Sequence, residues 1–168
     1  MKFSIVIPVH NEEKFIIDVL KRVNEQKKNF DIEIIISNDG STDQTNNLLE
    51  KNKGLYHILV YSEVNYGKGS AIKQGLEKAS GDFTLIQDSD LEYNPNDYKK
   101  LFEPALNFKA DVVYGSRFLG GSYVRLHFFW HFLANKLLTI ISNIFTNLNM
   151  TDMETGYKLI KTEALKNI

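Results

Sequence analysis

The strongest constraint on the fold is an alternation of short apolar runs with longer amphipathic stretches along the chain. The apolar runs are rich in β-branched and aromatic residues, which is typical of strands buried on both faces. They cover residues 3–8, 32–36, 58–61, 83–86 and 112–114. The amphipathic stretches predict helices over residues 12–25, 45–51, 69–79 and 96–108, the last kinked or split at Pro104. This order predicts an α/β fold with a parallel sheet and right-handed crossovers.

A pair of polar residues follows each predicted strand, close to the point where the strand ends. Parallel strands end at one edge of a sheet, and ligands of open α/β sheets bind in the crevice there. We therefore expect these residues to converge on one site. The pairs are His10 and Asn11, Asn38 and Asp39, Glu63 and Asn65, Asp88 and Asp90, and Ser116 and Arg117.

Asp88 and Asp90 are separated by one serine and directly follow the fourth predicted strand. Two carboxylates with this spacing can both reach one hard cation, whose remaining positions are filled by water and substrate phosphates. The pattern therefore indicates a Mg²⁺ or Mn²⁺ site that neutralises a diphosphate. The alternative interpretation is a solvated acidic turn that caps the next helix.

Residues 65–70, Asn-Tyr-Gly-Lys-Gly-Ser, are a second candidate site for phosphate. The glycines allow close backbone approach, and Lys68 adds positive charge at the start of a predicted helix, where the helix dipole favours anions. The alternative is a glycine-rich turn with an exposed lysine. The segment is not a P-loop, and residues 8–11 lack the glycine fingerprint of NAD-binding domains, which argues against NAD.

The composition limits the classes of partner and chemistry. The 168 residues suffice for one domain, and a net charge of −1 gives no basic excess of the kind that nucleic-acid binding requires. The chain has no cysteine, which excludes thiolate nucleophiles and cysteine-ligated metals and fits a cytoplasmic protein. Acidic residues follow the first short apolar run closely, so we expect mature protein rather than a signal peptide here.

Six motifs occur in order across this alternation: IVIPVHNEE, NDGSTD, NYGKGSAIKQG, QDSDLEYNP, VVYGSRF and TDMETGYKL. Together they resemble the family 2 glycosyltransferases of GT-A fold, especially the branch that transfers mannose or glucose to dolichyl or undecaprenyl phosphate. The resemblance implies a mostly parallel central sheet with helices on both faces, and one GT-A catalytic domain over residues 1–168. The chain ends earlier than most members of that branch, so we expect C-terminal helices to be missing.

The resemblance also implies roles for individual residues. Asp88 and Asp90 would hold a divalent cation, Mg²⁺ or Mn²⁺, and Asp39 would read the edge of the base. A UDP- or GDP-linked sugar would lie against Pro8, His10, Glu12, Asp39, Asn65 and Lys68. Asn38 departs from the family pattern, which often has two aspartates here, and Glu92 stands where mannosyltransferases often have glutamine. The second departure leaves the donor sugar open.

A sugar that leaves an anionic nucleoside diphosphate needs charge stabilisation, which the cation and Lys68 would supply. Direct displacement would invert the anomeric carbon. A polyprenyl phosphate acceptor is already anionic and needs no general base. Its phosphate would be held by Arg117, Arg125 and Lys158.

Two other functions are compatible with the same residues. Transfer to the hydroxyl of a soluble or polysaccharide acceptor would need a carboxylate base, for which Asp152 and Glu154 are the candidates. A non-catalytic module that binds nucleotide sugars would need neither a site for an acceptor phosphate nor a carboxylate base. The residues alone do not decide between these three functions.

Residues 126–148 are rich in Phe, Trp, Leu and Ile, but polar residues recur at helical spacing: His127, His131, Asn135, Thr139, Ser142 and Thr146. The stretch is therefore amphipathic rather than a clean transmembrane span. One interpretation is an interfacial helix on the cytoplasmic face of a membrane, with Arg125 and Lys136 near headgroups, which suits a polyprenyl phosphate acceptor. The other is a helix packed under the sheet or at the contact of a homodimer.

Overall fold

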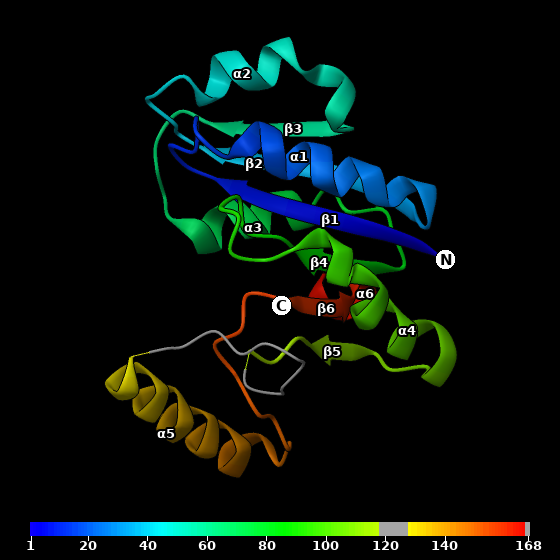
Figure 1. The fold of residues 1–168 in the computed structure, drawn as a ribbon, viewed down its shortest axis with the longest axis vertical. Coiled ribbons are helices and arrows are strands. Elements are labelled where there is room, and N and C mark those ends of the chain that lie inside the picture. The colour runs from blue at the N-terminus through cyan, green and yellow to red at the C-terminus, as the bar shows by residue number, and fades with distance from the viewer. Residues whose placement is uncertain (118–127, 167–168) are drawn as a thin grey trace.

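The computed structural model describes residues 1–117 and 128–166. In this part of the chain, six strands form one sheet in the order β3-β2-β1-β4-β6-β5 (Figure 1). The strands are β1 (Lys2–Val9), β2 (Asp31–Asp39), β3 (Ile58–Ser62), β4 (Phe83–Ile86), β5 (Val112–Tyr114) and β6 (Lys158–Lys161). The first five coincide with the predicted apolar runs, and β4 and β5 have the predicted bounds.

Parallel pairing dominates the sheet, as expected. β1 pairs with β2 from Lys2 opposite Asp31 to Val9 opposite Asn38, and it pairs in parallel with β4 on its other side. β3 pairs in parallel with β2. Because β6 runs antiparallel to both β4 and β5, β5 points the same way as β4. The strands β1 to β5 therefore all end at one edge of the sheet, here called the carboxyl edge.

The sequence pattern does not reveal β6, which is short and has a lysine at each end. Without a continuous apolar run, its four residues show no clear strand signal. Its antiparallel direction has a structural consequence. Lys158, its first residue, pairs with Ile86 and Tyr114 and so lies at the carboxyl edge, where the other strands end.

Helices cover both faces of the sheet (Figure 1). One apolar cluster includes Phe3 and Ile5 of β1 and is covered by α1, α2 and α4, while a smaller cluster around Val6 lies under α3. The alternation along β1 separates the two sets, as expected for a strand buried on both faces. The helices are α1 (Ile16–Glu25), α2 (Thr45–Lys51), α3 (Lys68–Leu76), α4 (Tyr98–Phe108), α5 (Phe129–Thr146) and α6 (Thr162–Leu165).

The helix α2 has the predicted bounds, whereas α1 begins at Ile16 rather than at residue 12, and α3 ends at Leu76 rather than at residue 79. Short 3₁₀ turns follow α1 and α2 and precede α4: η1 (Gln26–Lys28), η2 (Lys53–Leu55) and η3 (Pro95–Asp97). The helix α4 contains Pro104 and continues beyond it to Phe108, so the chain does not split into two helices at this proline. A proline at this position removes only one helical hydrogen bond, to the carbonyl of the exposed Lys100, which water can satisfy.

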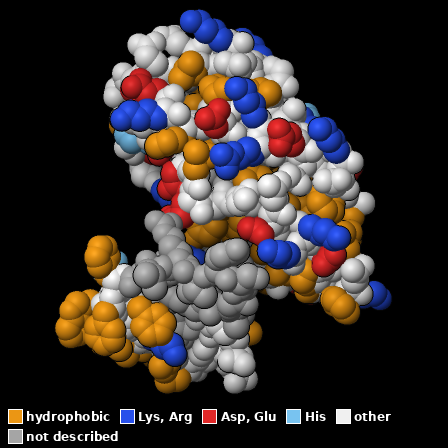
Figure 2. Space-filling view, viewed as in Figure 1, with side chains coloured by type: hydrophobic (Ala, Val, Ile, Leu, Met, Phe, Trp, Pro, Cys, Tyr) orange, Lys and Arg blue, Asp and Glu red, His pale blue; other side chains and the backbone are white. Residues whose placement is uncertain are grey.

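The helix α5 lies beside the sheet and turns its polar stripe, not its apolar stripe, toward the protein. Asn135 and Thr139 are buried, whereas Trp130 is 73% exposed and Phe145 is 85% exposed. Figure 2 shows the hydrophobic side chains gathered over α5 at the lower left. The interpretation of this segment as a core helix packed under the sheet is therefore wrong. No helix in the described residues is both long enough and apolar enough to span a bilayer.

A buried carboxylate connects the strands at the opposite end of the sheet from the carboxyl edge. Glu33 of β2 accepts hydrogen bonds from Lys2 Nζ at 2.7 Å, from the Ser80 backbone N at 2.6 Å and from Gly81 N at 3.0 Å, and also from the Ser4 hydroxyl. Burial alone would raise the pKa of Glu33, but these hydrogen bonds lower it to about 2. The ionised carboxylate therefore stabilises the fold.

We expect Glu33→Gln to lower the free energy of unfolding at pH 7 by about 2 kcal/mol, because it removes charged hydrogen bonds in a buried site. The folded-state pKa lies below the ordinary 4.5, so this stabilisation is complete above pH 4.5 and lost as the pH falls toward 2. Urea unfolding between pH 7 and pH 3 should show the two proteins converging at acid pH. Exposed Glu77→Gln is the control, and a difference that does not change with pH would contradict this account.

Candidate active site

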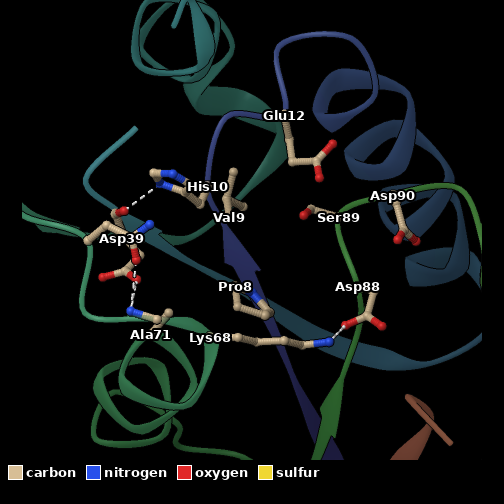
Figure 3. A pocket seen from close by; sticks show the side chains of 12 residues that line it. Pro8, Val9, His10, Glu12, Asp39, Lys68, Ala71, Asp88, Ser89 and Asp90 are labelled. Carbon is tan, nitrogen blue, oxygen red and sulfur yellow. Dashed lines mark hydrogen bonds and ion pairs between the residues drawn. The ribbon is translucent and has the colours of Figure 1, made fainter. Parts of the chain in front are cut away.

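The carboxyl edge carries a cavity of about 310 Å³. Figure 3 shows the side chains of its wall. All the residues predicted to contact the nucleotide or the cation lie in this wall: Pro8, His10, Glu12, Asp39, Asn65, Lys68, Asp88 and Asp90. The expected convergence is therefore observed in part: each of the first four polar pairs contributes to the wall, but Asn11, Asn38 and Glu63 do not line it. The fifth pair, Ser116 and Arg117, follows β5 further along the same edge.

Asp39, the last residue of β2, holds the loop that leads into α3. Its buried carboxylate accepts hydrogen bonds from Tyr66 N at 3.0 Å and from Gly67 N at 2.7 Å. Gly67 has a φ of 92°, a conformation that favours glycine, and it is the residue from which the chain enters α3. By holding this loop, Asp39 helps to position Lys68, the first residue of α3, as well as lining the cavity.

A second glycine brings the loops after β2 and β3 into contact. Gly40 has a φ of 65°, and a Cβ added there would lie 2.7 Å from Asn65 N and from the carbonyl carbon of Val64. Glycine is therefore required both by the backbone conformation and by the space available. This contact places Asn65 at the cavity wall.

The loop after β1 is connected to the end of β2 and to the loop that follows it through hydrogen bonds. The His10 Nδ1 lies 2.8 Å from the backbone carbonyl oxygen of Asp39. Asn11 adopts a φ of 55°, and its side-chain oxygen accepts a hydrogen bond from Thr42 N at 2.8 Å. The two loops therefore form one side of the cavity as a unit.

Carboxylates gather on the opposite side of the cavity (Figure 3). The Lys68 Nζ lies 2.6 Å from Asp88 Oδ1, and Asp90 Oδ1 accepts from Glu92 N at 3.0 Å. Burial, Asp90 and Asp43 raise the pKa of Glu12, which indicates a negative potential there.

Asp88 and Asp90 do not act as caps of the next helical turn, as the alternative interpretation of these residues requires. The next helical turn, η3, is capped by Asn94, whose side chain accepts from Asn96 N at 3.1 Å. The two aspartates are therefore not needed as caps. They line the cavity, where Asp88 has the ammonium of Lys68 as its counter-ion.

Below Asp88 lies a buried hydrogen-bond network. Gln87 is fully buried, and its Oε1 accepts from the hydroxyls of Tyr98 at 2.9 Å and Tyr157 at 3.0 Å. Its amide nitrogen donates to the Asp88 carbonyl at 2.9 Å. At Gly156, an added Cβ would lie 2.8 Å from Asp88 Oδ2, so the loop before β6 packs directly against this carboxylate. The position of Asp88 is thus fixed by the hydrogen bond from Gln87 and by the contact with Gly156.

Arg117 and Asp152 form an ion pair with two parallel hydrogen bonds. Arg117 donates to Asp152 from Nε at 2.8 Å, from Nη2 at 3.0 Å and from its backbone N at 3.1 Å. Burial alone would raise the pKa of Asp152, but hydrogen bonds from Arg117 and Asn135 lower it. A carboxylate held in its ionised form by an arginine is a weak proton acceptor at neutral pH.

Lys158 lies at the carboxyl edge, opposite Ile86 and Tyr114, and its Nζ lies 5.5 Å from the centre of the Tyr114 ring. Burial and the charge of Lys68 lower the pKa of Lys158, and Arg117 acts in the same direction, whereas Asp152 and Asp88 oppose this effect. Lys68, Arg117 and Lys158 therefore interact electrostatically at this edge. Arg125, the third predicted phosphate ligand, lies outside the described residues.

Sequence reasoning missed two contributors to the site, Ser89 and Asn135, and it named Gly67 only as part of the candidate phosphate segment 65–70. Ser89 lines the cavity between the two aspartates, and Gly67 provides an amide for Asp39. Asn135 of α5 donates to both Asp152 and Glu154. Only Gly67 had a sequence signal, a glycine just before a predicted helix, because the contacts of Asn135 depend on the tertiary packing of α5.

The family model described as "Glycosyl transferase family 2" matches residues 4–168, nearly the whole chain. The chain belongs to glycosyl transferase family 2.

Two relatives of this family 2 chain come from archaea. It is 26% identical over 171 residues to the dolichol-phosphate mannosyltransferase of Pyrococcus furiosus, a match that covers 100% of this chain and 48% of that protein. It is 30% identical over 179 residues to the UDP-N-acetylglucosamine–dolichyl-phosphate N-acetylglucosaminyltransferase of Methanococcus voltae, covering 96% of this chain and 70% of that protein.

Solved structures confirm the GT-A fold. The fragment 1–349 of S. aureus TarS in complex with UDP-GlcNAc has a TM-score of 0.71 and 26% identity, covering 99% of this chain and 47% of that fragment. Glucosyl-3-phosphoglycerate synthase from Mycobacterium tuberculosis, in complex with Mn²⁺, UDP and phosphoglyceric acid, has a TM-score of 0.75 at 21% identity, covering 99% of this chain and 58% of that one. The family 2 chain spans about half the length of the Pyrococcus furiosus relative.

We expect Gly40→Ala to destabilise the protein by about 1–3 kcal/mol, because alanine at a φ of 65° is strained and its Cβ would overlap the Asn65 amide. Hydrogen exchange should also become faster at the Tyr66 and Gly67 amides, which depend on the same loop contact. Gly54→Ala is the matched control, since nothing lies within 4 Å of a Cβ there. Equal effects of the two substitutions would contradict the assigned role of Gly40.

Proposed function

We propose that this glycosyl transferase family 2 chain transfers a sugar from a UDP- or GDP-linked donor to a polyprenyl phosphate, with inversion at the anomeric carbon. The observation that carries the proposal is the single cavity that joins Asp88 and Asp90 to Lys68 and to the ends of β1 and β2. Its wall offers carboxylate oxygens as ligands for a cation, the positive charge of Lys68 for a diphosphate, and polar groups for the base of the nucleotide.

The donor set suits a divalent cation that is shared with the substrate. Among residues 1–117 and 128–166, no group of three or more His, Cys, Asp and Glu side chains could enclose a metal ion. Asp88 and Asp90 would therefore hold Mg²⁺ or Mn²⁺ together with water and diphosphate oxygens, as is usual for hard cations at phosphate sites. Burial raises the pKa of Glu12, and the negative charges of Asp90 and Asp43 add to this effect; a cation at Asp90 would compensate those charges.

The chain's own residues would divide the reaction between them. A bound cation supplies charge stabilisation for the leaving nucleoside diphosphate. Lys68 would add a second positive charge, exchanging its contact with Asp88 for one with the diphosphate. Asp39 keeps Lys68 in place by holding the preceding loop. An oxygen of the acceptor phosphate would form the new bond to the anomeric carbon as the bond to the diphosphate breaks on the opposite side.

The charges around Asp152 favour a phosphate acceptor over a sugar hydroxyl. Asp152 is 1% exposed and is paired with Arg117, so it is a poor general base. The neighbouring cations Lys68, Arg117 and Lys158 form a suitable site for an anionic acceptor, which needs no base. The names of the two archaeal relatives, with dolichol-phosphate and dolichyl-phosphate, point in the same direction.

We also propose that α5 lies on the cytoplasmic face of a bilayer, on the side that holds the nucleotide sugar. The helix has exposed large apolar residues along most of its length, including Phe129, Trp130 and Phe145. Asn135 and Thr139 of its polar stripe are satisfied within the protein, so the apolar stripe is available to enter the interface. A lipid acceptor would be reached from this surface.

Donor binding and metal dependence can be tested together by calorimetric titration with UDP- and GDP-linked sugars, with and without Mn²⁺. We expect binding of one nucleotide class to require Mn²⁺. Asp88→Ala or Asp90→Ala should weaken it by about a hundredfold and abolish transfer to polyprenyl phosphate in detergent, because each removes a cation ligand. Asp18→Asn, an exposed carboxylate on α1, is the control. Unchanged turnover in the Asp88 and Asp90 variants would refute the proposal.

The acceptor class is tested by Asp152→Asn and Glu154→Gln. A base role would make either substitution collapse the rate of transfer to a soluble glycan while donor binding persists. We expect instead that transfer is seen only with polyprenyl phosphate. Tight donor binding without turnover on any acceptor would identify the chain as a nucleotide-sugar binding module.

Membrane docking is tested by flotation with vesicles of phosphatidylethanolamine and phosphatidylglycerol. Trp130→Glu should lower the bound fraction about tenfold, because burial of one large apolar side chain is worth about 1.5–3 kcal/mol. Phe108→Glu is the matched control, since Phe108 is 79% exposed but lies on α4. The contrary outcome is a wild type that fails to float with vesicles and forms a dimer that the Trp130→Glu substitution dissociates. That outcome would contradict membrane docking and show that a second copy of the chain covers α5.

A further inference from the structure

A single buried amide on α5 contacts the charged pair at the carboxyl edge. Asn135 is 2% exposed, although it belongs to a helix whose apolar side chains are mostly outside. Helices at a protein surface normally turn apolar residues inward. In α5 the inward contacts are made by Asn135 and Thr139 instead.

Both ends of the Asn135 amide are used. Its nitrogen donates to Asp152 Oδ1 at 2.9 Å and to Glu154 Oε2 at 3.1 Å. Its oxygen accepts from the Thr139 hydroxyl at 3.2 Å, and that hydroxyl accepts from Met153 N at 3.2 Å. The amide therefore connects the middle of α5 to three consecutive residues of the loop before β6.

The same loop holds Arg117. Asp152 accepts from Arg117 Nε at 2.8 Å and Nη2 at 3.0 Å, and Asn135 donates to one of the same two carboxylate oxygens. A planar guanidinium bound by both oxygens must follow any rotation of that carboxylate. The orientation of Arg117 therefore depends on where α5 places the Asn135 amide.

We propose that Asn135 is a positioning residue that couples the seating of α5 on a lipid surface to the orientation of Arg117 toward the acceptor phosphate. The inference rests on the proposed function. This network constrains the position of α5, because a displaced amide leaves the buried carboxylate of Asp152 without one of its hydrogen-bond donors. Apolar packing in its place would tolerate sliding of the helix without any effect on Arg117.

The chain offers a matched control on the same helix. Asn143 donates to the Met150 carbonyl at 2.9 Å and accepts from Met150 N at 2.9 Å. It anchors the C-terminal part of α5 through as many hydrogen bonds to the following loop, but these bonds do not involve Asp152. Asn135→Ala and Asn143→Ala therefore separate a role in positioning Arg117 from a role in holding α5.

The kinetic test measures transfer to polyprenyl phosphate in vesicles. We expect Asn135→Ala to raise the KM for the lipid phosphate about tenfold, while calorimetric donor affinity with Mn²⁺ and vesicle flotation stay at the wild-type level. Asn143→Ala should leave the KM unchanged. Equal KM values for the two variants, or a parallel loss of donor affinity in Asn135→Ala, would overturn the proposal.

The second readout is the NMR signal of the Arg117 Nε–H group, which donates a hydrogen bond to Asp152. Adding vesicles of phosphatidylethanolamine and phosphatidylglycerol should shift this signal in the wild type and in Asn143→Ala, but not in Asn135→Ala. This response without any sugar transfer would refute the proposed function and leave the coupling intact. No response in the wild type would refute the coupling. If Asn135→Ala does not fold, Asn135→Ser is measured, because its hydroxyl is too short to contact both carboxylates.

Discussion

The site depends on the parallel hydrogen-bond ladder that joins β1 to β2 and to β4. Val9 pairs with Asn38, so β1 and β2 end together, whereas β4 ends at Ile86 opposite Val6 and the chain continues from there to Asp88 at the cavity wall. A slip of one residue would turn every following side chain to the other face of the sheet. The buried runs of β1 and β2 prevent such a slip, because they pack against helices on both sides. Residues from distant parts of the chain are thereby delivered to one cavity.

Charge compensation is the second constraint on this edge. Carboxylates and cations meet there in pairs: Lys68 with Asp88 at 2.6 Å, and Arg117 with Asp152 at 2.8 Å. Such pairs limit the cost of holding charges in partly buried positions before a ligand arrives. A ligand that brings both a cation and phosphates can exchange partners with them without leaving a charge uncompensated. The overall net charge of −1 conceals this local organisation.

The sequence predicted the parts of the structure that depend on local pattern and strand direction. Apolar runs located β1 to β5, and the rule that parallel strands end together brought Asp39 and Asp88 to one edge. It did not predict β6, whose Lys158 reaches the same edge only because the strand is antiparallel. Nor did it predict that Asp39 binds the amide of Gly67, because that contact requires the loops after β2 and β3 to meet in space.

The orientation of α5 shows why periodicity alone was insufficient there. A helical period reveals two stripes but does not say which one faces the protein. In α1 the apolar stripe, with Val19 and Leu20, is buried against the sheet. Beside α5 the loop before β6 presents the buried Asp152, which needs hydrogen-bond partners. Asn135 donates to it, so Asn135 and Thr139 turn inward and the apolar stripe of α5 remains exposed.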